Sequence, residues 1–281
     1  DIDFSYSEFD VFSSEHEDVS EYWVVKDDAN AVYTGALGVL EAITDEAWIS
    51  PTGLDSSVST GTIGSPFKTI DYVFSRIYAT ADNHVDINLT GGTYGPDYTG
   101  EDFPIIMISN VNLIGQGEEE TIIDADSSGQ VIYFNSCSNI VVTNLTVTGG
   151  YKLNYYGGGG MFFITSNNIN ITNVTLRNNI ALSGGGATLL GSRVTFTNVV
   201  IKDNSVIDVG GGIYVVASSS MIGKNMIISG NHANGGGGIR FNQIHVNLPT
   251  ELINVTIFGN NADEHGGGLS LRRGGPQITN S

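Results

Sequence analysis

The sequence is poor in cysteine and in basic residues, and each shortage excludes something. Cys137 is the one cysteine among 281 residues, so no disulfide can form within the chain. There are 11 Lys and Arg against 30 Asp and Glu, a formal net charge of −19. This balance argues against nucleic-acid binding, which needs a basic surface. A polyanionic polysaccharide would likewise need a bridging cation or a local basic patch.

Long apolar runs are also missing. No stretch of the sequence approaches the ~18 apolar residues of a membrane span, so none is predicted. No basic-then-apolar leader opens the chain, and it ends at Ile278–Ser281, in the middle of a repeat. We therefore expect a mature protein or a fragment, and we expect the natural protein to continue into further domains.

Glycine, by contrast, is abundant, with 37 residues, and many of them are gathered in runs. The last glycine of each run falls at 160, 186, 212, 238 and 268, so the steps are 26, 26, 26 and 30 residues. A fixed period in the twenties is typical of a solenoid, in which each repeat is one coil stacked on its neighbour.

Each repeat also has an Asn between two short segments in which Val, Ile and Thr alternate with other residues. This alternation predicts strands, and Asn suits a one-residue bend because it tolerates the left-handed backbone conformation. In stacked coils such side chains would form a hydrogen-bonded ladder. The predicted ladder consists of Asn144, Asn173, Asn198, Asn225 and Asn254. Asn-x-Thr triplets, the acceptor pattern for glycans, start at Asn88, Asn144, Asn173 and Asn254, and we expect most of these Asn side chains to be buried in the ladder.

A second Asn follows six residues after the first in four repeats, and it predicts the start of the loop that leads to the next glycine run. These residues are Asn179, Asn204, Asn231 and Asn260. One coil would then contain three short strands and no helix, which defines a parallel β-helix. The predicted fold class is all-β.

The glycine runs and the Asn254–Ile257 segment, followed by Asn260, resemble the repeats of the right-handed parallel β-helix, or pectate-lyase-like, superfamily. They look especially like those of bacterial surface proteins related to polymorphic outer-membrane autotransporters, whose FxxN pattern is similar to Phe258–Asn261. The resemblance covers about residues 105–281. It implies the fold rather than one function, because the superfamily holds lyases, hydrolases, esterases, adhesins and inert stalks.

The sequence predicts three parts: an acidic N-terminal arm (1–45), a capping module with a first coil (46–104), and a parallel β-helix that stops in mid-coil (105–281). The capping module is similar to the opening of many secreted β-helices. It includes apolar residues at helical spacing, which predict an amphipathic helix of roughly ten residues: Ile70, Val73, Phe74, Ile77 and Tyr78. We expect this helix to cover the open end of the first coil.

The strand after each glycine run is the best candidate for a binding surface. Its first and third residues are apolar in every coil and should face the core, so the second and fourth should face outward. The outward residues are apolar in the early coils, which suggests a covering segment, and polar in the later ones. Ordinary solvated residues are the alternative. The predicted carbohydrate-binding residues are Tyr214, Arg240, Asn242, Arg272 and Arg273.

The resemblance implies that a polysaccharide would lie in a groove over this sheet, where aromatic rings stack on sugars and Arg pairs with uronate carboxylates. It also implies that a lyase would use a Lys or Arg base, often with Ca²⁺. A glycosidase needs two carboxylates, and the outward strand positions of residues 161–272 hold none. The carboxylates elsewhere suit turns and loops: Asp124, Asp126, Asp263 and Glu264. The coil positions of His232, His245 and His265 predict no metal cluster.

The sequence thus predicts an exported, secreted or cell-surface, non-enzymatic protein: an adhesin, a binder of polysaccharide or host glycan, or a structural stalk. The alternative is a polysaccharide lyase acting on an acidic polysaccharide near Arg240 and Arg272, with calcium as its cofactor. Without lyase activity no cofactor is expected. A spacer for another domain is a third option.

Overall fold

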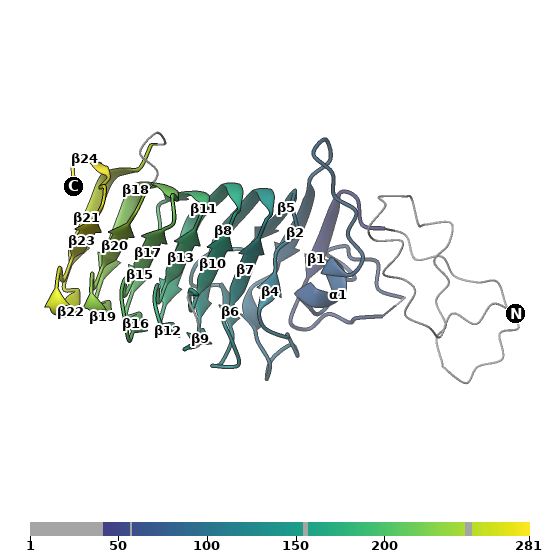
Figure 1. The fold of residues 1–281 in the computed structure, drawn as a ribbon. Coiled ribbons are helices and arrows are strands. Elements are labelled where there is room, and N and C mark those ends of the chain that lie inside the picture. The colour runs from purple at the N-terminus through teal and green to yellow at the C-terminus, as the bar shows by residue number, and fades with distance from the viewer. Residues whose placement is uncertain (1–41, 57, 154–156, 245–248) are drawn as a thin grey trace, which may run out of the picture.

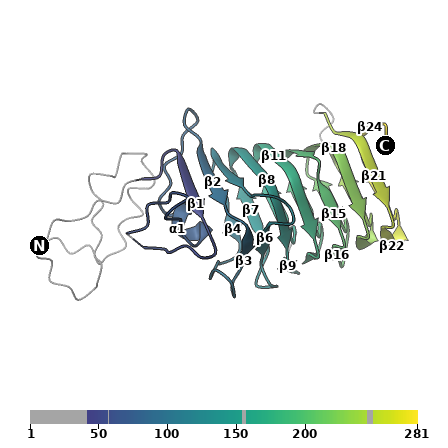
Figure 2. The same cartoon turned by 180° about the vertical axis from the view of Figure 1, so that it is seen from behind.

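The computed structural model describes residues 42–281 apart from 57, 154–156 and 245–248. These residues form a parallel β-solenoid whose coils follow one another along one long axis (Figures 1 and 2). Most of the predicted acidic arm, residues 1–41, lies outside the described part of the chain.

From β7 to β22, each coil contributes strands to three parallel sheets, as predicted, whereas β1 to β6 contribute none to the five-stranded sheet. The 12-stranded sheet contains β1 (Glu46–Ile49), β2 (Val85–Leu89), β3 (Gly92–Tyr94), β5 (Val111–Ile114), β6 (Thr121–Asp124), β8 (Ser138–Thr148), β11 (Asn167–Arg177), β14 (Arg193–Thr197), β15 (Val200–Lys202), β18 (Ser220–Ser229), β21 (Glu251–Phe258) and β24 (Gln277–Thr279). The seven-stranded sheet contains β4 (Ile105–Ile106), β7 (Ile132–Asn135), β10 (Met161–Ile164), β13 (Ala187–Leu190), β17 (Ile213–Val216), β20 (Ile239–Asn242) and β23 (Leu269–Arg272). The five-stranded sheet contains β9 (Tyr151–Lys152), β12 (Ile180–Ala181), β16 (Ser205–Val206), β19 (His232–Gly235) and β22 (Asn261–His265).

The strand registers confirm the alignment predicted from the glycine runs. The first residues of β10, β13, β17, β20 and β23 pair in order: Met161, Ala187, Ile213, Ile239 and Leu269. The first four of them are fully buried. The core is therefore a column of stacked side chains in which residues about 26 positions apart in sequence become neighbours.

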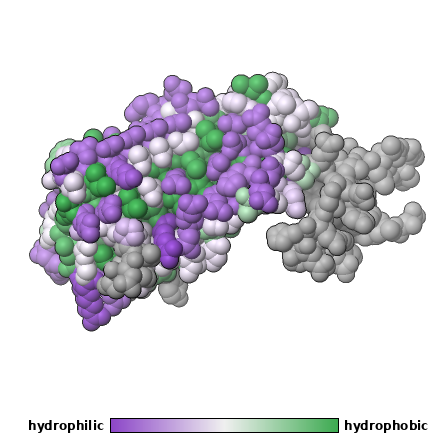
Figure 3. Space-filling view, turned by 90° about the horizontal axis from the view of Figure 1, so that it is seen from above, coloured by the Kyte–Doolittle hydropathy of each residue, from purple (hydrophilic) through white to green (hydrophobic). Residues whose placement is uncertain are grey.

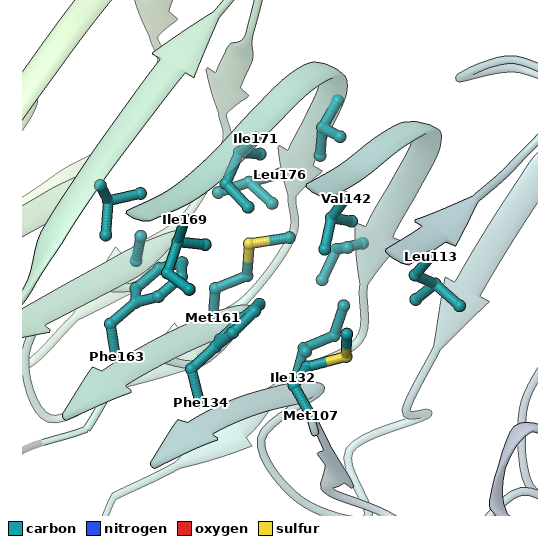
Figure 4. Close-up of a cluster of buried hydrophobic side chains, with 14 of the residues drawn as sticks. Met107, Leu113, Ile132, Phe134, Val142, Met161, Phe163, Ile169, Ile171 and Leu176 are labelled. Carbon is teal, nitrogen blue, oxygen red and sulfur yellow. The ribbon is translucent and has the colours of Figure 1, made fainter. Parts of the chain in front are cut away.

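Aromatic side chains of successive coils also stack on one another in the core. Phe134 and Phe163, on successive coils, have ring centroids 4.3 Å apart at 20°, and both are completely buried (Figure 4). Phe196 meets Phe163 edge-on at 6.3 Å. Such pairs contribute about 0.5–1.5 kcal/mol each beyond their buried area.

The five predicted ladder residues share a left-handed backbone, with φ between 51° and 58°. The side-chain amide of each donates to the side-chain carbonyl of the preceding one, at 3.0, 3.1, 3.0 and 2.8 Å. The predicted burial of this ladder is wrong, because Asn198, Asn225 and Asn254 are exposed. The bend turns these side chains along the outer edge of the coil. We call this column the outer ladder.

A second, buried ladder occupies the next bend. Asn179, Asn204 and Asn231 are at most 1% exposed, and Asn260 continues the column. The Asn204 side-chain carbonyl accepts from both the backbone N–H and the side chain of Asn179, each at 3.0 Å. The sequence predicted only that these residues open a loop. Here they satisfy backbone groups inside the coil, and we call this column the inner ladder.

The predicted helix is present but shorter, as α1 (Ile70–Phe74). The Thr69 hydroxyl caps its first turn by accepting from the Tyr72 N–H at 3.2 Å, and it ends at Ser75. It stops there because Ile77 pairs with Ile43 as an extended bridge. The role of α1 as a cap stays a prediction. No helix in the described part of the chain has the length and hydropathy to cross a membrane.

Candidate functional site

Within the seven-stranded sheet, the second residues of β10, β13, β17, β20 and β23 line up as one column, as the alignment predicted. They are not exposed, however, although alternation predicted that they face solvent. Their exposed fractions are between 0% and 9%: Phe162, Thr188, Tyr214, Arg240 and Ser270. We call this set the covered column.

The glycine runs cover this column. Gly210 and Gly236 both have φ of 70°, a conformation that favours glycine. A Cβ added to Gly210 would lie 2.9 Å from the Tyr214 Cβ, and one added to Gly236 would lie 3.0 Å from the Arg240 Cβ. These two left-handed glycines therefore let the chain fold back over the strand that follows each of them. The glycines that recur in each coil are thus also the residues that cover the second positions of the following strands, so the same feature of the sequence produces both the repeat period and the burial of the covered column.

Arg240 is the charged member of this column. Its guanidinium Nη1 donates to the Ser270 hydroxyl, while its Nε has no hydrogen-bond partner. No described carboxylate forms an ion pair with it, because the ion pairs of the described residues all involve histidines. A guanidinium that is 9% exposed and has no counter-ion is energetically unfavourable unless another group pairs with it.

Three predicted site residues lie together here. Tyr214 and Arg240 are paired in register on β17 and β20. The Asn242 side-chain amide donates to the Tyr214 hydroxyl at 3.2 Å, and the Asn242 Oδ1 is buried without a partner. The cluster therefore presents two unsatisfied polar atoms, one donor and one acceptor, within a single pair of coils.

The fourth residues of the same strands form the accessible part of this face, and we call them the fourth-position row. The row changes from polar to apolar and back to polar along the solenoid: Asn135, Ile164, Leu190, Val216, Asn242 and Arg272. Its apolar members and Asn242 are half-buried, and Arg272 is exposed. Arg273, also exposed, follows in a left-handed conformation with φ of 59°. Figure 3 shows hydrophilic and apolar side chains interspersed on the upper face of the molecule.

The alignment missed an aromatic extension of this sheet because it began at Met161. Tyr133 precedes Phe162 in the same column, and their rings stack with centroids 5.7 Å apart. Ile106 precedes Tyr133 and is 58% exposed. Tyr133 also lies in the apolar run 131–134, which predicts a strand, and this was the signal in the sequence that could have found it.

The carboxylates and histidines of the described residues form no group of three that could hold a metal ion. Asp124 accepts from the Asp126 N–H at 2.9 Å, which is a turn contact. His232 lies 3.1 Å from Asp263, and the two are on the neighbouring strands β19 and β22, together with His265. His232 pairs in register with Asn261 and His265 pairs with Gly235, so these two histidines stand at different positions of their coils, as the sequence predicted. His245 lies outside the described residues. The use of calcium stays a prediction.

Three comparisons place the chain among known proteins. The family described as "Protein of unknown function (DUF1565)" matches residues 52–274. No curated protein matches the sequence. Among solved structures, pectin methylesterase PemA from Erwinia chrysanthemi is similar with a TM-score of 0.51 and 12% identity, over 79% of this chain and 68% of that one. Pectate lyase Pel9A is similar with a TM-score of 0.40 and 14% identity, over 86% and 78%. The predicted right-handed parallel β-helix fold is confirmed.

Proposed function

Because the chain belongs to the DUF1565 family, whose description names no activity, we propose a function from the surface of its fold. The protein is an exported, surface-associated, non-enzymatic β-helix that binds a polysaccharide along the fourth-position row. The pectin methylesterase with the same fold acts on pectin, as its name states. That likeness supports a polysaccharide as the class of ligand.

The observation that carries the proposal is the chemistry of the fourth-position row. Its half-buried apolar side chains, Ile164, Leu190 and Val216, stand on consecutive coils, which are about 4.8 Å apart. Asn242 and Arg272 continue the row with amide and guanidinium donors. An apolar floor that ends in oriented polar groups suits a sugar chain, whose faces are apolar and whose edges carry hydroxyl groups.

The same surface argues against hydrolysis. The second and fourth positions of β7, β10, β13, β17, β20 and β23 carry no Asp or Glu. A glycosidase places two carboxylates across its groove, about 5–9.5 Å apart according to mechanism. Binding without cleavage therefore fits this face better than a hydrolytic reaction does.

One observation favours the lyase alternative, and it is the uncompensated Arg240 beside Asn242. A desolvated guanidinium could pair with a uronate carboxylate of an acidic polysaccharide. Arg240 is nearly inaccessible behind Gly236, so a ligand would have to displace the glycine run to reach it. Lyase activity is tested directly by incubation with polygalacturonate and Ca²⁺, following the absorbance of the unsaturated product.

A glycan array with the full chain tests binding, and titration calorimetry then compares variants on any glycan that binds. Arg272→Ala should weaken binding at least several-fold, because the exposed guanidinium contacts the ligand. Lys68→Ala, a basic residue of the capping module, is the matched control and should bind as the wild type does. No binding to any glycan would support a stalk or spacer instead, and equal losses in both variants would place the ligand elsewhere.

We also propose the organisation that this function needs: an acidic arm (1–45), a capping module (46–104) in which α1 covers the first coil, and the solenoid (105–281). A secreted or cell-surface location follows from the proposed ligand. Limited proteolysis of the folded protein with a protease of broad specificity, followed by mass spectrometry of the fragments, tests the two proposed boundaries; trypsin is unsuitable because no Lys or Arg lies between Lys26 and Lys68 or between Arg76 and Lys152.

A further inference from the structure

Charge is distributed very unevenly along the chain. Residues 1–41 contain eleven Asp and Glu and one Lys, and residues 42–156 contain fourteen acidic and three basic residues. Residues 157–250 reverse this balance, with five Lys and Arg against two Asp. The middle coils are therefore a locally positive segment in a protein whose formal net charge is −19.

Four of these five basic residues lie on the 12-stranded sheet, on both sides of the outer ladder. Arg193 and Lys224 come before the ladder residues of their coils, and Arg177 and Lys202 come after them. Arg177 and Lys202 are direct register partners on β11 and β15, one coil apart. Arg193 and Lys224 are exposed, and the other two are half-buried. We call these four residues the basic face.

None of the four has an ion-pair partner among the described residues. The described acidic groups next to the basic face form no ion pair with it. Glu118 accepts from the Thr175 hydroxyl at 2.9 Å. Glu251, on β21, is the register partner of Ile222, two residues before Lys224, and forms no ion pair with Lys224. Asp203, next to Lys202, is exposed and has no ion pair with it. Two unpaired cations on adjacent coils repel each other across about 4.8 Å, so an anionic partner would relieve them.

We propose that the acidic N-terminal segment, residues 1–41, binds this basic face within the same molecule. Its charge is complementary to the face, whereas the coils at 42–156 repel it. This inference uses the 12-stranded sheet and is independent of the proposed glycan-binding row.

The reach of the segment is sufficient. It joins the fold just before β1, and β11 and β18 lie four and six strands further along the same sheet, or about 19 and 29 Å away. A coil of 41 residues has a root-mean-square span of about 35 Å. Tethering also raises the local concentration of the segment to the millimolar range, which favours it over an untethered polyanion at a lower concentration.

Zero-length carbodiimide coupling of the full chain, followed by mass spectrometry, tests the proposal because it joins lysines only to carboxylates in direct contact. We expect Lys202 and Lys224 to be coupled to acidic residues of the 1–41 segment, with Lys68 and Lys152 as internal controls. The yield should fall several-fold in Arg177→Gln/Arg193→Gln, which weakens the face and keeps both lysines. Lys68→Gln should leave the yield unchanged. Salt at 1 M, where the Debye length is about 3 Å, should abolish the coupling.

Coupling of a mixture of ¹⁵N-labelled and unlabelled protein separates contacts within one molecule from contacts between copies. Links found only between labelled and unlabelled chains would overturn the proposal in favour of an intermolecular contact. Equal coupling at all four lysines, or no coupling to 1–41, would also overturn it. If no coupling occurred and dextran sulfate bound the wild type but not the double variant, the occupant would be an external polyanion.

Discussion

The backbone N–H of Cys137 donates to the hydroxyl of Ser166 at 3.2 Å, and the Cys137 sulfur lies 3.4 Å from that same hydroxyl oxygen. Cys137 is thereby the first member of a third ladder, in which Ser166 bonds Ser192 and Ser192 bonds Ser219, at 3.0 and 3.1 Å. All three serines are completely buried. Burial also raises the pKa of the Cys137 thiol, so the thiol is a packed core group and not a reactive one.

Cys137→Ser should therefore be nearly neutral, changing the free energy of unfolding by no more than about 1 kcal/mol, because serine already fills this position in the next three coils. Ser192→Ala is the contrasting variant. It leaves the buried Ser166 N–H without an acceptor and should lower stability by about 1–3 kcal/mol. Urea unfolding followed by circular dichroism measures both. A large loss in Cys137→Ser would show that the thiol has a role beyond the ladder.

The two asparagine ladders should respond differently to the same substitution. Asn204→Ala in the inner ladder orphans the buried Asn179 N–H and the Leu176 carbonyl, so it should lower stability by about 3 kcal/mol or more. Asn198→Ala in the exposed outer ladder removes a hydrogen bond that water can replace, and it puts Ala at a left-handed position with φ of 54°, which Asn tolerates better. It should lower stability by about 1 kcal/mol. Similar losses in the two variants would contradict the assignment of inner and outer ladders. Thermal unfolding of the two proteins under identical conditions makes the comparison.

These ladders also show what the sequence could and could not predict. The glycine period and the outer ladder fixed the coil register, because both signals recur at corresponding positions of successive coils. The serine ladder was missed because Ser166 and its partners stand among other serines with no distinctive neighbours. The burial of Arg240 was missed because strand alternation describes a sheet face and says nothing of a glycine segment folding over it. The alignment therefore correctly predicted that Tyr214, Arg240 and Asn242 are neighbours, but their accessibility could be known only from the structure.

Thr165 is a strained position. It is β-branched and has φ of 45°, whereas Gly191, which follows the last paired residue of the next coil just as Thr165 does in its own, has φ of 61°. Thr165→Gly should raise stability by about 0.5–1 kcal/mol, the relief of the left-handed strain less the greater chain entropy of glycine. Gly191→Ala should lower it by about 1 kcal/mol although the nearest atom to the new Cβ would be 3.7 Å away. Differential scanning calorimetry of the two variants measures whether each is more or less stable than the wild type. A less stable Thr165→Gly protein would show that the hydrogen bond between the Thr165 and Ser136 hydroxyls, at 2.9 Å, outweighs the backbone strain.

Glu101 should make the stability of the solenoid depend on pH. Its side chain is 2% exposed, its Oε1 accepts from the Ile70 N–H at 2.7 Å, and its Oε2 has no partner. Burial, opposed by the backbone N–H groups of Ile70 and Asp71, raises the pKa of Glu101 from 4.5 to about 7. The folded state therefore binds this proton more tightly than the unfolded state does.

The contribution of Glu101 is most favourable below pH 4.5 and is lost as the pH rises through about 7. The loss is on the order of 3 kcal/mol. Glu101→Gln keeps the Ile70 acceptor and removes the charge, so the variant should match the wild type near pH 4.5 and be more stable at pH 8. Urea unfolding at a series of pH values, with the exposed Glu119→Gln as control, isolates this difference. A gap between Glu101→Gln and wild type that stayed constant across the series would mean that Glu101 does not titrate in this range.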